Sequence, residues 1–104
     1  MASTTTINKV KDFASQVHEC GVSLKRVVLF GSHASNTQNR YSDIDVALVA
    51  DEFVSVPSED VKLFLKAFRK HYIMQPQTYN TKDFSPDKDP FVNEILKTGI
   101  EIEI

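Results

Sequence analysis

The residues of this chain whose types and spacing suggest chemistry are a Gly-Ser pair and an Asp-x-Asp pair. Gly31 and Ser32 follow an apolar run, and Asp43 and Asp45 open a second one. Runs rich in valine and leucine are typical of buried strands, so the first pair predicts a turn and the second a strand start. Aspartates two positions apart on a strand point to the same side. Backbone N–H donors facing paired carboxylates suit a metal-bound polyphosphate.

The Gly-Ser pair has both a functional and an ordinary interpretation. Gly31 permits a sharp turn and the close approach of a ligand. Ser32 offers a hydroxyl at the start of a helix, where phosphate is favoured. Taken alone, the pair is more typical of a plain strand-to-helix turn with a serine cap.

The two aspartates shift the interpretation toward a metal site. Residues at this spacing lie roughly 7 Å apart on one strand face, within reach of a shared divalent ion or of two ions ~4 Å apart. The alternative is a solvated strand start in which Asp43 belongs to a turn. Asp45, however, heads a continuous apolar run. A carboxylate beside the buried part of a sheet needs a partner, and a metal ion is one.

The elements that must position these residues alternate between helix and strand. Pro76 cannot donate to a strand ladder, so it marks an edge strand or a break. The pattern predicts an α+β or α/β fold, a small mixed β-sheet with helices packed on it. The expected elements are a helix capped by Thr6 and Gly21, a strand at 27–30, a short helix from Ser32, a strand at 44–49, a helix at 58–70, a strand at 73–79, a helix from Pro90 capped by Gly99, and a half-exposed strand at 100–104.

Composition bounds the function. A chain of 104 residues predicts a single small domain, 1–104, and a core of this size makes a protein partner or a homo-oligomer plausible. The net charge of −2 gives no basic stripe for nucleic acid. A single cysteine, Cys20, fits a reducing cytosol. Neither an apolar run of ~20 residues nor a signal peptide is evident, so we expect a cytoplasmic protein without a membrane span.

The motif resembles that of a known family. Gly31-Ser32-x-Ala34, followed after residues 35–42 by Asp43-x-Asp45 and apolar residues, is similar to the signature of the nucleotidyltransferase superfamily with a polymerase-β-like core. The short length is similar to its minimal branch, the MNT-type proteins. Phe84 and the segment 89–100 also resemble the usual ending of the family.

The resemblance implies a function for each pair. Gly31 and Ser32 would bind the triphosphate, and Asp43 and Asp45 would be catalytic ligands of two Mg²⁺ ions. The implied reaction transfers NMP to a hydroxyl, with AMP from ATP as the expected case. Minimal members commonly pair with a helical HEPN-type protein as antitoxin to its toxin, with a tyrosine of the partner as acceptor. The alternative is a catalytically weak or inactive nucleotide–Mg²⁺ binding module that acts through a protein partner.

The chain departs from the family pattern at two places. Asn36 stands where a glycine is usual, although asparagine tolerates a left-handed backbone. The family's third metal-binding carboxylate is expected on the strand at 73–79, which has no acid. Our alignment places Gln77 there, with Gln75 as the alternative on the same face, and an amide is a neutral ligand that cannot act as a base. Acids that would substitute, unless they are simply solvated, are Asp83, Glu101 and Glu103.

Two further features carry weaker predictions. His33 and Arg40 flank the phosphate turn and are expected to decorate the surface. An apolar loop before the helix at 58–70 is expected either to fold beneath that helix or to form a partner surface. Its apolar residues are Phe53, Val54 and Val56.

Overall fold

A four-stranded mixed sheet forms the centre of the protein. The computed structural model describes residues 3–35, 37 and 43–104. The strand order is β3-β2-β1-β4, with β1 antiparallel to both β2 and β4, and with β2 parallel to β3. The strands are β1 at Leu24–Phe30, β2 at Ile44–Ala50, β3 at Met74–Tyr79 and β4 at Ile100–Ile102. The predicted fold class, a small mixed sheet covered by helices, is confirmed.

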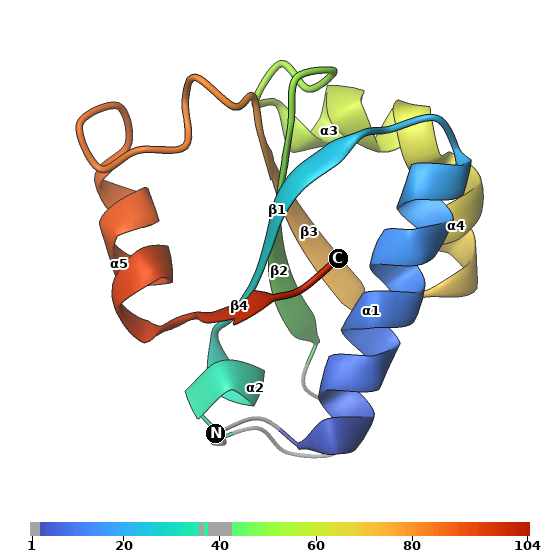
Figure 1. The fold of residues 1–104 in the computed structure, drawn as a ribbon, viewed down its shortest axis with the longest axis horizontal. Helices are drawn as coiled ribbons and strands as arrows, with labels where there is room; N and C mark the ends of the chain where they lie inside the picture. Colours follow the sequence, from blue (N-terminus) through green and yellow to red (C-terminus); the bar gives the residue numbers. More distant parts are fainter. Residues whose placement is uncertain (1–2, 36, 38–42) are drawn as a thin grey trace.

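Helices cover both faces of the sheet (Figure 1). The helices α1 and α4 lie on one face and α5 lies on the other, while the short α2 follows directly from the end of β1. None of the helices in the described part of the chain is long and apolar enough to cross a membrane. The helices are α1 at Thr4–Glu19, α2 at Ser32–Ser35, α3 at Pro57–Asp60, the 3-10 turn η1 at Val61–Phe64, α4 at Leu65–Lys70 and α5 at Pro90–Thr98.

The alternation of side chains along β2 builds two cores. Ile44, Val46 and Leu48 point into a larger core beneath α1 and α4, where Phe13 and Phe64 pack edge to face. The intervening residues of β2 point toward α5. The smaller core on that side consists of Val28, Phe30, Ala47, Val49, Tyr79, Phe84, Val92 and Ile95. The two aspartates share the α5 side, because they are in phase with Ala47 and Val49.

The predicted caps of α1 are half right. Gly21 ends the helix as expected, with φ at +99° just after the C-cap residue Cys20. The N-cap is Ser3 rather than Thr6, because the Ser3 side chain accepts a hydrogen bond from the Thr6 backbone N–H at 3.1 Å. Thr6 is instead a buried residue of the first turn.

The helix predicted at 58–70 is interrupted. It begins at Pro57 and consists of α3, η1 and α4. The buried carboxylate of Asp60 accepts hydrogen bonds from the backbone N–H groups of Val54 and Val56 and from the Thr78 hydroxyl. Since these bonds fix the end of α3 to the preceding loop and to β3, the chain tightens into a 3-10 turn before α4 begins.

The loop before α3 combines both expected roles. Phe53 is buried, with its ring 5.8 Å from that of Phe64. Val54 and Val56 remain exposed, by 63% and 44%. The loop therefore contributes to the core through one side chain and presents the other two to solvent.

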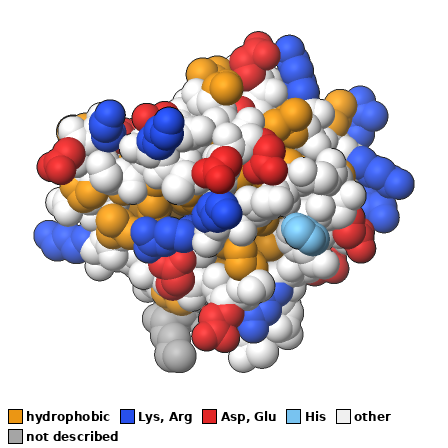
Figure 2. Space-filling model, turned by 45° about the horizontal axis from the view of Figure 1, so that its top comes forward, with side chains coloured by type: hydrophobic (Ala, Val, Ile, Leu, Met, Phe, Trp, Pro, Cys, Tyr) orange, Lys and Arg blue, Asp and Glu red, His pale blue; other side chains and the backbone are white. Residues whose placement is uncertain are grey.

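Charges of both signs are interspersed on the face seen in Figure 2. Arg26 donates to Glu101 at 2.6 Å and lies over the Phe84 ring, 5.0 Å from its centroid. The view shows no field of one sign, in keeping with the small net charge.

Gly99 joins α5 to β4 at a crowded point. A Cβ there would lie 2.6 Å from Val28 Cγ1 and 3.1 Å from the Leu29 carbonyl, and would overlap the Ile95 carbonyl. We expect Gly99→Ala to lower the free energy of unfolding by about 1–3 kcal/mol, since overpacking forces backbone shifts. Urea denaturation of the apo protein measures this. A loss below about 0.5 kcal/mol would mean that the junction yields easily.

Candidate functional site

The Gly31 turn and Asp45 are in direct contact. Phe30, the last residue of β1, pairs with Asp45 on β2, and Gly31 follows with φ at +76°. A Cβ at Gly31 would lie 3.1 Å from Asp45 Cγ and would overlap Oδ2. A glycine is thus required at position 31 for two reasons: the backbone is left-handed, and the Asp45 carboxylate occupies the space that a Cβ would need. The predicted juxtaposition of turn and carboxylate is present.

Asp43 and Asp45 differ in their surroundings. Asp43 is exposed just before β2, whereas Asp45 is half-buried within it. Burial raises the pKa of Asp45, the negative charge of Asp43 raises it further, and His33 opposes both. Two carboxylates that repel one another at a partly desolvated strand start are suited to accept a cation.

The register between β3 and β2 decides which glutamine lies nearer to Asp45, at the position expected for a third metal ligand. Gln75 lies directly opposite Asp45, and Gln77 lies opposite Ala47, one pleat further along. Both glutamines are exposed and point to the same side of the sheet as Asp45. The alignment to Gln77 stays a prediction, but Gln75 is the amide that the parallel pairing places nearest the carboxylate.

His33 is a correction to the sequence-based prediction. It is only 8% exposed, so it does not decorate the surface. The turn of α2 directs it toward α1, where its Nδ1 lies 3.5 Å from the Thr6 hydroxyl, and its charge acts on the pKa of Asp45. Nothing in the sequence signalled this, because a four-residue helix has too little periodicity to define a buried side. Asn36 and Arg40 lie outside the described residues.

The acids considered as substitutes lie away from the two aspartates. Glu101 is on β4, opposite Val28 of β1, so that β1 lies between it and the aspartates. Its side chain forms an ion pair with Arg26. Asp83 accepts a hydrogen bond from Ser55 at 2.6 Å beyond the far ends of β2 and β3. Glu103 lines a groove beside α1. The described residues contain no cluster of three His, Cys, Asp or Glu side chains suited to a metal.

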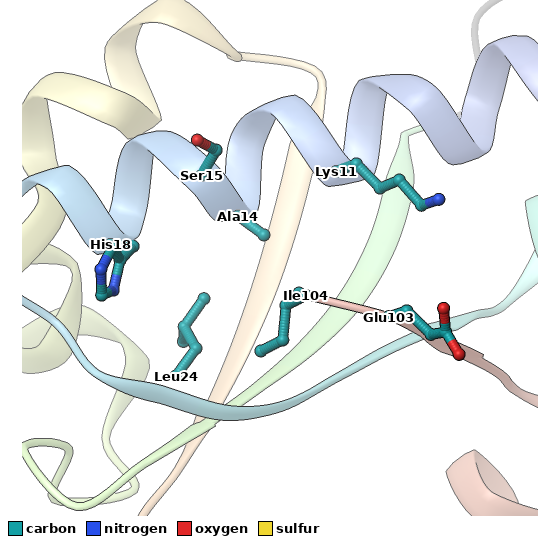
Figure 3. A pocket seen from close by; sticks show the side chains of 7 residues that line it. All are labelled: Lys11, Ala14, Ser15, His18, Leu24, Glu103 and Ile104. Atoms are coloured by element: carbon teal, nitrogen blue, oxygen red, sulfur yellow. The ribbon is translucent and has the colours of Figure 1, made fainter.

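That groove is separate from the aspartate site. It has a volume of about 480 Å³ and lies between α1 and the β4 edge of the sheet, with Lys11 and Glu103 at one end (Figure 3). The aspartates point to the opposite, α5 side. Because the groove and the aspartates lie on different faces, we do not assign the groove to nucleotide. The other lining residues are Ala14, Ser15, His18, Leu24 and Ile104.

Comparison with known families identifies the fold to which this geometry belongs. The family model described as "Nucleotidyltransferase domain" matches residues 7–101. The chain belongs to this nucleotidyltransferase family. The match spans the turn, both aspartates and β3, so the resemblance inferred from the motif is confirmed. Comparison with curated proteins finds no significant match.

Solved structures share the fold at low sequence identity. One toxin-antitoxin crystal structure with AMP-PNP has a TM-score of 0.64 and 21% identity, over 93% of this chain and 72% of that one. A putative nucleotidyltransferase from Sulfolobus solfataricus has a TM-score of 0.63 and 15% identity, over 93% and 78%. A mutant of the toxin-antitoxin MntA-HpeT has a TM-score of 0.62 and 17% identity, over 89% and 71%.

The raised pKa of Asp45 predicts a pH-dependent stability in the absence of metal. The folded state holds the Asp45 proton more tightly than the unfolded chain, so ionisation of Asp45 weakens folding above its raised pKa. We expect Asp45→Asn to be more stable than wild type at pH 7, by less than about 1 kcal/mol because the site is partly solvated. The gain should shrink as pH falls through that pKa.

Thermal melts in EDTA across pH 3–8 measure this difference, and Asp51→Asn, at the other end of β2, is the control. If Asp45→Asn lowers stability at pH 7, the carboxylate is a structural hydrogen-bond acceptor and not an unsatisfied cation ligand.

Proposed function

We propose that this protein transfers NMP, AMP from ATP, to a hydroxyl acceptor by two-metal catalysis within one domain, 1–104. The observation that carries the proposal is the contact between the Gly31 turn and the Asp45 carboxylate. A turn that receives phosphate and a carboxylate that holds the phosphate's counter-ion are expected to lie side by side, and these two do.

The donor set fits Mg²⁺. Asp43 and Asp45 supply hard, anionic oxygens on one side of β2, and Gln75 offers an amide oxygen from β3. When bound, the metal would neutralise charge on the polyphosphate and acidify the acceptor hydroxyl. The protein's own part is to hold the triphosphate against Gly31 and Ser32, and to keep the aspartates aligned along a strand that the sheet makes rigid.

The amides on β3 favour one alternative, a catalytically weak module that binds nucleotide and Mg²⁺. A glutamine is neutral, so it neither offsets metal charge nor takes a proton from the acceptor. Nucleotide binding through the aspartates would persist, because these remain anionic. The alternative and the main proposal thus differ in transfer rate and not in affinity.

We propose further that the acceptor belongs to a protein partner, a helical HEPN-type protein to which this chain is the antitoxin. Support comes from two structural neighbours described as toxin-antitoxin proteins, one of them with AMP-PNP. Incubation of the chain with labelled ATP, Mg²⁺ and the product of the adjacent gene tests both proposals together. Label on a tyrosine of the partner, lost with Asp45→Asn, is the expected result. Metal-dependent ATP binding without label would support the weak module.

The neutral β3 position predicts a gain of function. We expect Gln75→Asp to raise the transfer rate by about 10-fold or more with little change in nucleotide affinity, because it adds the missing anionic ligand opposite Asp45. Gln77→Asp, one pleat away, tests the original alignment. Initial rates and titration calorimetry with the same nucleotide separate rate from affinity. If both substitutions slow a fast wild-type enzyme, the third ligand lies elsewhere.

A further inference from the structure

An exposed aromatic ring stands close to the aspartate site. Phe30 is the β1 residue that pairs with Asp45, and its ring lies 5.7 Å from the Phe91 ring, edge to face at 81°. Phe30 is 8% exposed, but Phe91 is 47% exposed. The buried Phe30 ring thus lies between Asp45 and the exposed Phe91 ring, on the same side of the sheet.

The open ring is held in place. Phe91 occupies the first turn of α5, where Pro90 precedes it and the Asp89 carboxylate caps its backbone N–H at 3.0 Å. Contact with Phe30 fixes the ring itself. The Asp89 cap and the Phe30 ring therefore hold the Phe91 side chain in place. A side chain that is already held loses less conformational entropy when a ligand packs on it.

We infer that Phe91 is the surface on which the nucleobase of the bound nucleotide stacks. This inference rests on the proposed function. With the phosphates held between Gly31 and the aspartates, which point to the α5 side, we place the ribose and base on that same side. Base–aromatic stacking uses the π-face that every base has and reads no hydrogen-bonding edge. Phe91 therefore favours purine nucleotides by stacking area and distinguishes ATP from GTP only weakly.

A ligand that lacks the base separates this inference from the proposed function. We expect Phe91→Ala to weaken binding of Mg²⁺–AMP-PNP by roughly tenfold, the typical effect of losing one base–aromatic contact, and to leave Mg²⁺–tripolyphosphate unchanged. Leu96→Ala, on the same helix and 38% exposed, should change neither. Titration calorimetry gives all the affinities.

A spectroscopic readout is available because the chain has no tryptophan. In Phe91→Trp, fluorescence should be quenched by Mg²⁺–ATP and not by Mg²⁺–tripolyphosphate, whereas Leu96→Trp should respond to neither. Tyr72→Ala provides the competing case, since Tyr72 is 84% exposed in the turn before β3.

Each outcome decides one question. If wild type binds neither ligand, the proposed function fails. Two results would overturn the role of Phe91 with the function intact: both ligands bind and Phe91→Ala changes neither, or Tyr72→Ala alone weakens AMP-PNP. Equal weakening of both ligands by Phe91→Ala, together with a lower melting temperature, also overturns the role, because it makes Phe91 a packing residue only.

Discussion

Asp45→Asn should abolish metal-dependent nucleotide binding while the fold persists. Removing a residue behind a metal ligand typically reduces metal affinity by about 10–100-fold, so we expect loss of a direct ligand to reduce Mg²⁺–AMP-PNP affinity by more than about 100-fold. Asparagine keeps the shape of the side chain beside Gly31, so the turn itself should survive. Titration calorimetry with and without Mg²⁺, beside a circular dichroism melt, measures both statements.

The matched control for this experiment is Asp51→Asn. Asp51 follows the opposite end of β2 and is exposed, with a 4.0 Å contact to Lys25. The Asp51→Asn substitution removes the same charge at the other end of β2, away from the Gly31 turn. Should Asp51→Asn weaken binding as much as Asp45→Asn does, net charge and not a metal site would explain the affinity.

Gly31→Ala should destabilise the protein and eliminate nucleotide binding together. The substitution meets two costs at once: a non-glycine residue at φ +76°, and a Cβ that overlaps the Asp45 carboxylate. Each is worth about 1–3 kcal/mol. We expect the free energy of unfolding to fall by roughly 2–6 kcal/mol, the sum of the two, in urea denaturation, and the displaced carboxylate to lose its metal.

Gly21→Ala separates the two costs. Gly21 also has a positive φ, +99°, but a Cβ there has no neighbour within 4 Å. It should cost only about 1 kcal/mol and leave nucleotide binding intact. In an Asp45→Ala background the additional penalty of Gly31→Ala should shrink, because the overlapping carboxylate is gone. Equal penalties at both glycines would show that the turn relaxes away from Asp45 without loss.

The sequence was sufficient for the site wherever local chemistry decided the structure. The Gly31 turn, the short helix from Ser32 and the strand after Asp43 follow from apolar runs and turn residues over a few positions. The same holds for the proline-started α5, where Asp89 and Pro90 define the helix start. Such features depend on neighbours in the chain, so a single sequence specifies them.

What could not be predicted depends on contacts between distant segments. The burial of His33 follows from the way α2 packs against the first turn of α1, and the break after α3 follows from the bonds of Asp60 to β3. Register is of the same kind. The alternation along 73–79 places Gln75 and Gln77 on one face, but only the pairing of β3 with β2 decides which one lies opposite Asp45.

The two edge strands of the sheet have features that disfavour pairing with strands of other molecules. A sheet with a bare edge offers a row of unpaired backbone groups to any extended chain, the route by which β-proteins polymerise. Here the edge strand β3 carries Pro76, which has no N–H to offer, and the edge strand β4 is only three residues long, with Glu101 at its middle. Strand-to-strand polymerisation is thereby discouraged at both ends. We therefore expect a partner to bind the side chains of helices and loops, where an interface can be specific, rather than the backbone of the edge strands.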